Sequence, residues 1–181
     1  MGKRVTWKRD AVVSLMLRKN LYTLGQMLRS PAMRYYNIAS DNGRWGRVNL
    51  SEVEPLFTLL IGTIVLQNLV DGKVSDKLIK PSLQPCERYW IKAKLNFDGG
   101  YPLKGGQLIE IGADGDIDTL QAIVVKDDLS LDSDRDLISK YQLTSMRGDN
   151  HIRERLVHFF DRGEDRDLLK EKVFPGYRSD S

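Results

Sequence analysis

Carboxylates crowd one short stretch of the chain. Residues 110–136 hold nine Asp and Glu against two Lys and Arg, a local net charge of −7. Asp114, Asp116 and Asp118 alternate as the acidic ligands of a calcium-binding EF-hand loop do. Counted from Asp114, however, the sixth and twelfth positions are threonine and valine, where that loop requires glycine and glutamate. The pattern therefore does not predict a calcium site, and we expect no bound metal.

The two histidines, His151 and His158, are seven residues apart in a segment with helical spacing, so they share one face. A small ribonuclease could use two histidines as general acid and base. It would also need a cationic or hydroxyl partner in a cleft, and nothing in the sequence marks one. Cys86 has no nucleophile signature, and no glycine-rich phosphate loop follows a strand. We expect a protein without enzymatic activity or cofactor and keep the ribonuclease as an alternative.

Positive charge gathers at the start of the chain. Residues 1–50 hold ten Lys and Arg against Asp10 and Asp41, a net charge of +8. Interleaved aromatic residues could form a sheet that stacks bases and follows phosphates. Adjacent Tyr35 and Tyr36 must point to opposite faces of a strand, so at most one could join such a platform. A nucleic-acid-binding module is therefore a second alternative, although no specific RNA-binding motif supports it.

The first part of the chain has the composition of short strands separated by turns. The pattern predicts strands at residues 5–7, 11–17, 22–28, 33–39, 56–66, 87–95, 107–111 and 119–125, and a loop at 71–85. Gly25, inside the third of these strands, predicts a bulge or a bend with positive φ, because glycine is often placed where a sheet must curl.

The last part changes to helical periodicity. Ser133 or Asp134 can cap a first helix, and Asp149 or Asn150 can cap a second. A short third helix is expected between Gly163 and the Pro-Gly pair at 175–176. We therefore predict an α+β fold, with a strongly curved, mostly antiparallel sheet (a half-barrel) and two or three C-terminal helices.

Length and composition favour one domain that spans residues 1–181. Residues 1–125 should be mainly β, 126–175 mainly helical, and 176–181 a frayed tail. The longest apolar stretch, residues 56–66, is shorter than the roughly 20 residues that a membrane helix needs. A single cysteine excludes an intramolecular disulfide and favours a reducing compartment. We expect a cytoplasmic protein without membrane association.

The order of several segments resembles a known family. A basic segment at residues 3–7 precedes Asp10 and the strand at 11–15, and a Tyr-x-x-Gly turn follows at 22–25. The apolar strand at 55–61 and the late helical segment at 152–156 continue the likeness. In this order the chain resembles the bacterial polymorphic-toxin immunity family known as immunity protein twenty-six.

The resemblance implies a cytoplasmic inhibitor that binds a cognate toxin domain stoichiometrically and has no catalytic residues. Because complementary charge speeds the association of such pairs, the acidic segment is the predicted toxin-binding surface and a basic nuclease-type toxin its partner. The oligomeric state stays open. The predicted binding residues are Asp114, Asp116, Asp118, Asp127, Asp128, Asp132 and Asp134.

Overall fold

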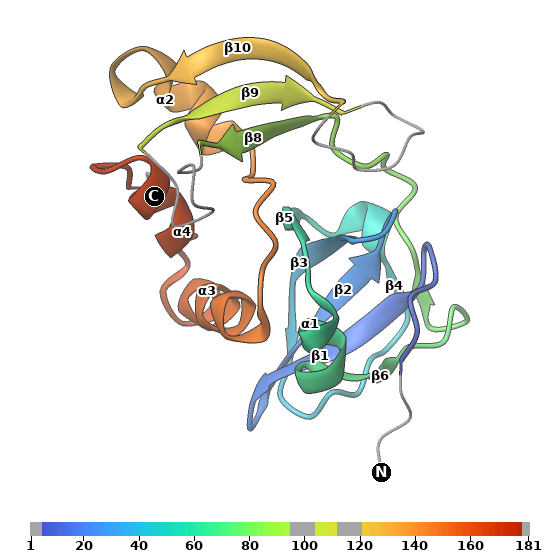
Figure 1. Ribbon diagram of the computed structural model, residues 1–181. Coiled ribbons are helices and arrows are strands. Elements are labelled where there is room, and N and C mark those ends of the chain that lie inside the picture. The colour runs from blue at the N-terminus through green and yellow to red at the C-terminus, as the bar shows by residue number, and fades with distance from the viewer. Residues whose placement is uncertain (1–4, 95–103, 112–120, 179–181) are drawn as a thin grey trace. The chain divides into compact units, whose positions relative to one another are not determined.

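A computed structural model describes residues 5–94, 104–111 and 121–178 (Figure 1). The chain divides into two compact units. The first consists of residues 1–86 and 146–157, and the second of residues 87–145 and 158–181. Each unit is described by itself below.

The first unit is built on a five-stranded antiparallel sheet with the order β5-β3-β2-β1-β6. Its strands are β1 (Val12–Arg18), β2 (Leu21–Met27), β3 (Ala32–Ser40), β5 (Pro55–Leu60) and β6 (Val70–Lys73). The short strands β4 (Val48–Asn49) and β7 (Ile79–Lys80) form a parallel pair, and a 3₁₀ turn, η1, spans Leu50–Glu52. The predicted strands at 11–17, 22–28 and 33–39 are thus confirmed.

The hairpin between β1 and β2 follows from its two-residue loop. Asn20 has a φ of 62° in this loop. Asparagine tolerates the left-handed region better than most residues, and tight hairpin loops require it. The pairing then sets Ser14 opposite Leu24 and Leu15 opposite Thr23.

Gly25 lies next to a register irregularity between β2 and β3, as the sequence predicted. The predicted positive φ is wrong, because Gly25 is not among the residues with positive φ. The lack of room for a side chain explains the glycine instead. A Cβ at this position would come within 2.9 Å of Leu15 Cδ1 and of Met33 Sδ, closer than real Cβ atoms approach.

Three expectations for the first unit are wrong. The stretch 56–66 is not one strand, because β5 ends at Leu60 and helix α1 (Thr63–Asn68) begins after Gly62. The Gly62 amide donates to the Arg147 carbonyl at 3.0 Å, which ends the pairing with β3. The expected loop at 71–85 contains most of β6 and all of β7, and residues 5–7 are not in a strand.

Both faces of the five-stranded sheet are covered. One core cluster contains Val12, Leu24 and Tyr36, and Leu50 and Ile79 complete it. Tyr35 packs against the Phe57 ring, with 5.5 Å between the centroids. The start of helix α3 (Asp149–Arg162) buries Ile152 and Leu156, and its Arg155 guanidinium lies 3.9 Å from the Phe57 centroid.

The second unit holds a three-stranded antiparallel sheet with the order β10-β9-β8. These strands are β8 (Tyr89–Ala93), β9 (Gly106–Glu110) and β10 (Ile123–Leu129), and the helices α2 (Leu131–Lys140) and α4 (Leu168–Val173) belong to the same unit. The predicted strand at 119–125 is therefore displaced towards the C-terminus. The core of the unit combines Ile91, Leu108 and Leu129 with Ile138 of α2 and Val173 of α4.

The fold class is the predicted one. The protein is α+β, and its five-stranded sheet is open and somewhat curved, with helices α2, α3 and α4 in the C-terminal part of the chain. Within the described residues the strands are divided among three sheets, whereas the sequence predicted a single one. In the part of the chain that the structure describes, no helix is both long and apolar enough to cross a membrane.

Candidate protein-binding surface

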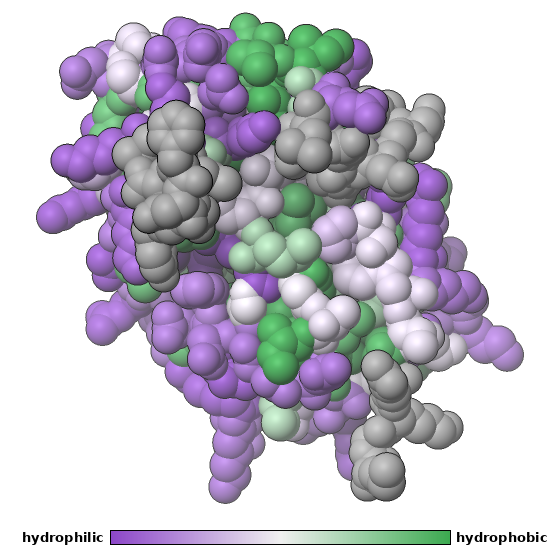
Figure 2. All heavy atoms as spheres, in the orientation of Figure 1, coloured by the Kyte–Doolittle hydropathy of each residue, from purple (hydrophilic) through white to green (hydrophobic). Residues whose placement is uncertain are grey.

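Strand β10 exposes apolar side chains at the edge of its sheet. Among the described residues only β9 pairs with it. Ile123 is 66% exposed, and Val124 and Val125 are each 49% exposed. The apolar spheres at the top of Figure 2 lie where Figure 1 draws β10. Because consecutive strand residues point to opposite faces, these three exposed β-branched side chains form an apolar patch that wraps around both faces of the edge strand. Exposed apolar surface of this kind is typical of an interaction site.

Two irregularities shape this strand. The register with β9 shifts between Val124 and Lys126 and again between Lys126 and Leu129. Asp128, inside the second shift, has a φ of 48°. Bulges and charged residues keep an edge strand from pairing with another chain's backbone. The side chains of β10, rather than its backbone, are therefore available to a partner.

The acidic half of β10 is held in place by neighbouring strands. Asp127 accepts a hydrogen bond from Gln107 Nε2 of β9 and another from the Asp128 amide, both at 2.9 Å. Asp128 forms an ion pair with Lys94, just after β8. Both aspartates remain exposed at the surface. Their carboxylates thus have defined positions beside the apolar patch.

Asp134 has a different role. Only 3% of this residue is exposed, and its φ and ψ interrupt α2. Its Oδ2 accepts from the Ser130 amide at 3.0 Å and from Ser133 Oγ at 2.8 Å, and its Oδ1 pairs with the Lys126 ammonium. The carboxylate reaches back to the amide that begins the helix, as the acidic residue of a capping box does.

The same contacts lower the pKa of Asp134 from 3.8 to about 2. The hydrogen bond from Lys126 is the main cause, and the Ser130 amide adds to it. Both groups favour the charged carboxylate, so protonation would weaken the connection between β10 and α2. Asp134 therefore joins the strand to the helix rather than offering a charge to a partner.

The structure brings some of the predicted binding residues together. Asp127 and Asp128 lie side by side on β10, and Asp132 is exposed in the first turn of α2. Asp134 is buried beside them. Asp114, Asp116 and Asp118 lie outside the described residues. We use the name β10 surface for Ile123, Val124, Val125, Asp127, Asp128 and Asp132.

The β10 surface combines two kinds of contact. Apolar side chains lose water on contact and supply affinity, whereas exposed carboxylates attract a basic partner and orient it. Nearby cations balance some of the acids, since Lys94 pairs with Asp128 and Lys126 with Asp134. Within the described part of the chain, Asp127 and Asp132 form no ion pair with Lys or Arg, and they carry the remaining negative charge of the surface.

The two histidines lie at different places along one helix. Both lie on α3, where seven residues correspond to a rise of about 10 Å along the axis. His151 is exposed. His158 lines a cavity of about 730 Å³ together with Glu164, Asp165 and Arg166, and His151 does not line it. The two imidazoles therefore do not share this cavity.

The aromatic residues of the basic half are used inside the first unit. Tyr35 and Tyr36 are both buried, one on each face of β3. Trp7 Nε1 donates to the Leu28 carbonyl at 3.1 Å, and Trp45 Nε1 donates to Ser14 Oγ at 3.0 Å. The stacking platform that a nucleic-acid-binding module requires is therefore not formed by these side chains.

No cluster of three or more His, Cys, Asp or Glu suited to a metal ion occurs within residues 5–94, 104–111 and 121–178. The hydrogen bonds of Asp134 in the second unit are explained by helix capping and an ion pair.

Sequence reasoning missed the apolar half of the surface. Residues 119–125 were expected to form a strand, but three consecutive apolar residues are as typical of a buried strand as of an exposed one. A signal was present in the Lys-Asp-Asp triplet at 126–128, because charges of this kind mark strand edges. The apolar residues at 123–125 and the charged triplet at 126–128 together indicate an edge strand.

The comparison with protein families covers nearly the whole chain. The model of a family described as a domain of unknown function (DUF8309) matches residues 2–179. The chain belongs to this family. Its description assigns no activity, and the matched range extends over both compact units. No curated protein and no solved structure matches the chain.

Proposed function

We propose that this protein is a cytoplasmic, non-enzymatic immunity protein that binds and neutralises a cognate bacterial toxin domain. The observation that carries the proposal is the β10 surface, where an exposed apolar patch borders exposed carboxylates on one edge strand. The order of segments in the sequence, which resembles immunity protein twenty-six, supports the same function.

The chemistry of the β10 surface selects its partner. Asp127 and Asp132 favour a surface rich in Lys and Arg, such as the substrate-binding face of a nuclease-type toxin. Ile123, Val124 and Val125 need an apolar recess on that toxin, because affinity comes mainly from a few desolvated anchors. Binding there would exclude the nucleic acid substrate from the same basic face.

Inhibition by occlusion is stoichiometric, and this separates it from an enzymatic antidote. The test is co-expression of the protein with the C-terminal toxin domain of the adjacent upstream gene. Cell growth should recover only when the protein is present at least in equal amount to the toxin. The purified pair should co-elute as one complex.

A matched pair of variants locates the surface. Ile123→Lys places a charge in the β10 patch, and Ile64→Lys makes the same change at an isoleucine of α1 that is 41% exposed. We expect Ile123→Lys to abolish co-elution and Ile64→Lys to retain it. Rescue by amounts of protein far below those of toxin, or equal behaviour of the two variants, would contradict the proposal.

A further inference from the structure

A cavity in the first unit has the size of a small-molecule site. Its volume is about 570 Å³, which lies within the range of ligand pockets. Its walls come from three regions of the sequence: residues 5–7, residues 30–31 and the stretch 61–71. All three belong to the first unit, so the cavity does not depend on the second unit.

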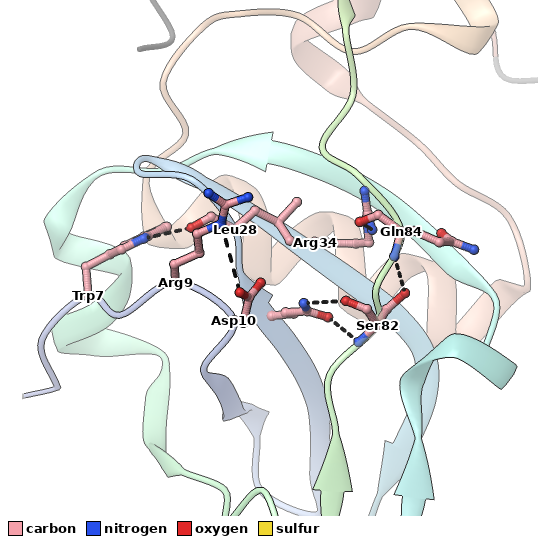
Figure 3. Close-up of polar contacts among 8 residues, drawn as sticks. Trp7, Arg9, Asp10, Leu28, Arg34, Ser82 and Gln84 are labelled. Carbon is pink, nitrogen blue, oxygen red and sulfur yellow. Dashed lines mark hydrogen bonds and ion pairs between the residues drawn. The ribbon is translucent and has the colours of Figure 1, made fainter. Parts of the chain in front are cut away.

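Hydrogen bonds hold the walls of this cavity in place. Trp7 Nε1 donates to the Leu28 carbonyl at 3.1 Å and so ties the indole to the end of β2 (Figure 3). The Ile61 amide donates to the Pro31 carbonyl at 3.0 Å, which joins two of the three regions. A cavity with ordered walls loses little conformational entropy when a ligand binds.

Apolar side chains form one part of the lining. Five of them are only half-buried: Val5, Trp7, Pro31, Leu66 and Val70. A ligand that covered these side chains would remove apolar surface from water, which favours binding. The lining therefore suits a ligand with an apolar body.

The cavity has one ionisable side chain among its described lining residues, the carboxylate of Asp71. Asp71 is exposed, and within the described part of the chain it forms no ion pair with Lys, Arg or His. No cationic side chain among these lining residues could bind a phosphate or a carboxylate, and Asp71 would repel either group. One carboxylate is also too few to hold a metal ion. The charge of the cavity therefore favours a ligand with a positive group.

Trp7 favours the same kind of ligand. An indole ring attracts cations more strongly than the other aromatic side chains do, and it also offers a large apolar surface. Thr63 and Gln67 of α1 line the cavity as well. Within the described residues neither of these two side chains bonds to the protein, so both can bond to a ligand.

We propose that this cavity binds a small organic amine, a molecule that carries one ammonium group on an aromatic or aliphatic body. Asp71 accepts hydrogen bonds from the ammonium group, Trp7 adds a cation–π contact, and the apolar side chains cover the body of the ligand. This site goes beyond the proposed toxin binding, because it lies in the first unit and shares no residue with the β10 surface.

Three ligands of similar shape test the role of charge. Near neutral pH, 2-phenylethylamine is cationic, 2-phenylethanol is neutral and 3-phenylpropionate is anionic. Each is titrated into the full chain, and binding is followed by NMR at the indole N–H signal of Trp7, which a Trp7→Phe variant assigns. We expect the amine to bind roughly tenfold more tightly than the alcohol, because an exposed ion pair and a cation–π contact distinguish the two ligands. The carboxylate should not bind.

A matched pair of variants tests Asp71. Asp71→Asn removes the charge at nearly constant volume, so it should weaken amine binding about fivefold and leave alcohol binding unchanged. A merely structural role of Asp71 would change the affinity for both ligands alike. Asp76→Asn is the control, because Asp76 is also an exposed aspartate of the first unit but does not line this cavity. It should leave both affinities unchanged.

Three results would each overturn the proposal. The first is a Trp7 signal that does not move with millimolar 2-phenylethylamine. The second is equal affinity for the amine and the alcohol. The third is an equal effect of Asp71→Asn and Asp76→Asn on amine binding. Because the assay contains no toxin domain, all of these results are independent of the function proposed for the β10 surface.

Discussion

Strands β1 and β10 have the same length, and both begin with apolar residues. However, β1 is mostly buried and β10 is mostly exposed. Both are seven residues long, and each contains a Val-Val pair near its start. In β1, flanked by β2 and β6, five residues are buried, whereas in β10 only Leu129 is. Val13 is fully buried, and Val125 is 49% exposed.

The difference shows that neighbours, not composition, decide what an apolar strand does. β1 has a hydrogen-bonded strand on each side and core residues over its faces, so its valines stabilise the fold. β10 has one neighbour among the described residues and carries bulges and charges that protect its edge. Apolar residues that remain exposed there do not contribute to the core, which is why we assign them to a partner.

The largest expected effect tests the tight packing around β1. Gly25→Val should destabilise the protein by about 3 kcal/mol, because even a Cβ would meet Leu15 and Met33 at 2.9 Å. Gly72→Val on β6 is the control, since a Cβ there meets nothing within 4 Å. Urea denaturation measures both free energies of unfolding. Equal midpoints for the two variants would show that the sheet is not closely packed at Gly25.

The same substitution in β1 and in β10 compares the two strands directly, and we expect a smaller effect on stability than for Gly25→Val. Val13→Ala removes two buried carbon atoms and leaves a cavity, so we expect a loss of about 2 kcal/mol. Val125→Ala removes the same atoms from an exposed site and should change stability by less than about 0.5 kcal/mol. Urea midpoints with unchanged slopes measure both. A large loss for Val125→Ala would mean that β10 is buried and is not a binding surface.

A third effect depends on pH and concerns the connection from β10 to α2. The pKa of Asp134 is lowered to about 2 in the folded protein, so the unfolded state binds more protons between about pH 4 and pH 2. The stabilisation is fully present above pH 4 and is lost as the pH falls through 2. Asp134→Asn should therefore lower the thermal midpoint near pH 6 and have little effect near pH 2.

The control for this prediction is Asp132→Asn, which lies two residues earlier in α2 and is exposed. It should change the midpoint little at any pH. Nearly constant destabilisation by Asp134→Asn from pH 6 to pH 2 would indicate a cause other than the charged carboxylate. Because Asp134 acts in folding, removing it together with the exposed aspartates would not test binding cleanly.

The sequence predicted the elements that depend on local chemistry. Short runs of strand-forming composition separated by turns predicted β1, β2 and β3, and helical spacing predicted α2, α3 and α4. The prediction from sequence failed where long-range contacts determine the secondary structure. Residues 63–68 form a helix although they contain Thr, Ile and Val, and Gly62 before them bonds to the distant Arg147 carbonyl instead of continuing the strand. β6 and β7 pair with strands far away in the chain, which periodicity alone does not reveal.

The sequence predicted only the charged residues of the candidate site. Asp127, Asp128 and Asp132 are exposed, but the burial of Asp134 depends on Lys126 and Ser130, whose positions follow from the bulged strand. The way in which Gln26 and Arg34 hold residues 81–85 could not be predicted either. Gln26 and Ser82 are 56 residues apart, and nothing near Ser82 or Gln84 in sequence indicates that Gln26 and Arg34 bond to them.

The central claim is that the β10 surface binds a basic toxin domain. The most direct test is the association rate with that domain, measured by surface plasmon resonance at two salt concentrations. One variant carries Asp127→Asn, Asp128→Asn and Asp132→Asn. The matched control carries Asp41→Asn, Asp71→Asn and Asp76→Asn, which removes three exposed charges from the first unit.

Charges at an interface act mainly on association, and salt screens them. We expect the β10 variant to associate roughly tenfold more slowly at low salt, with a flatter salt dependence, and the control to match the wild-type protein. Thermal midpoints of both variants near that of the wild type would exclude unfolding as the cause. Equal association rates for the β10 variant and the control at both salt concentrations would contradict the account and place the toxin-binding surface elsewhere.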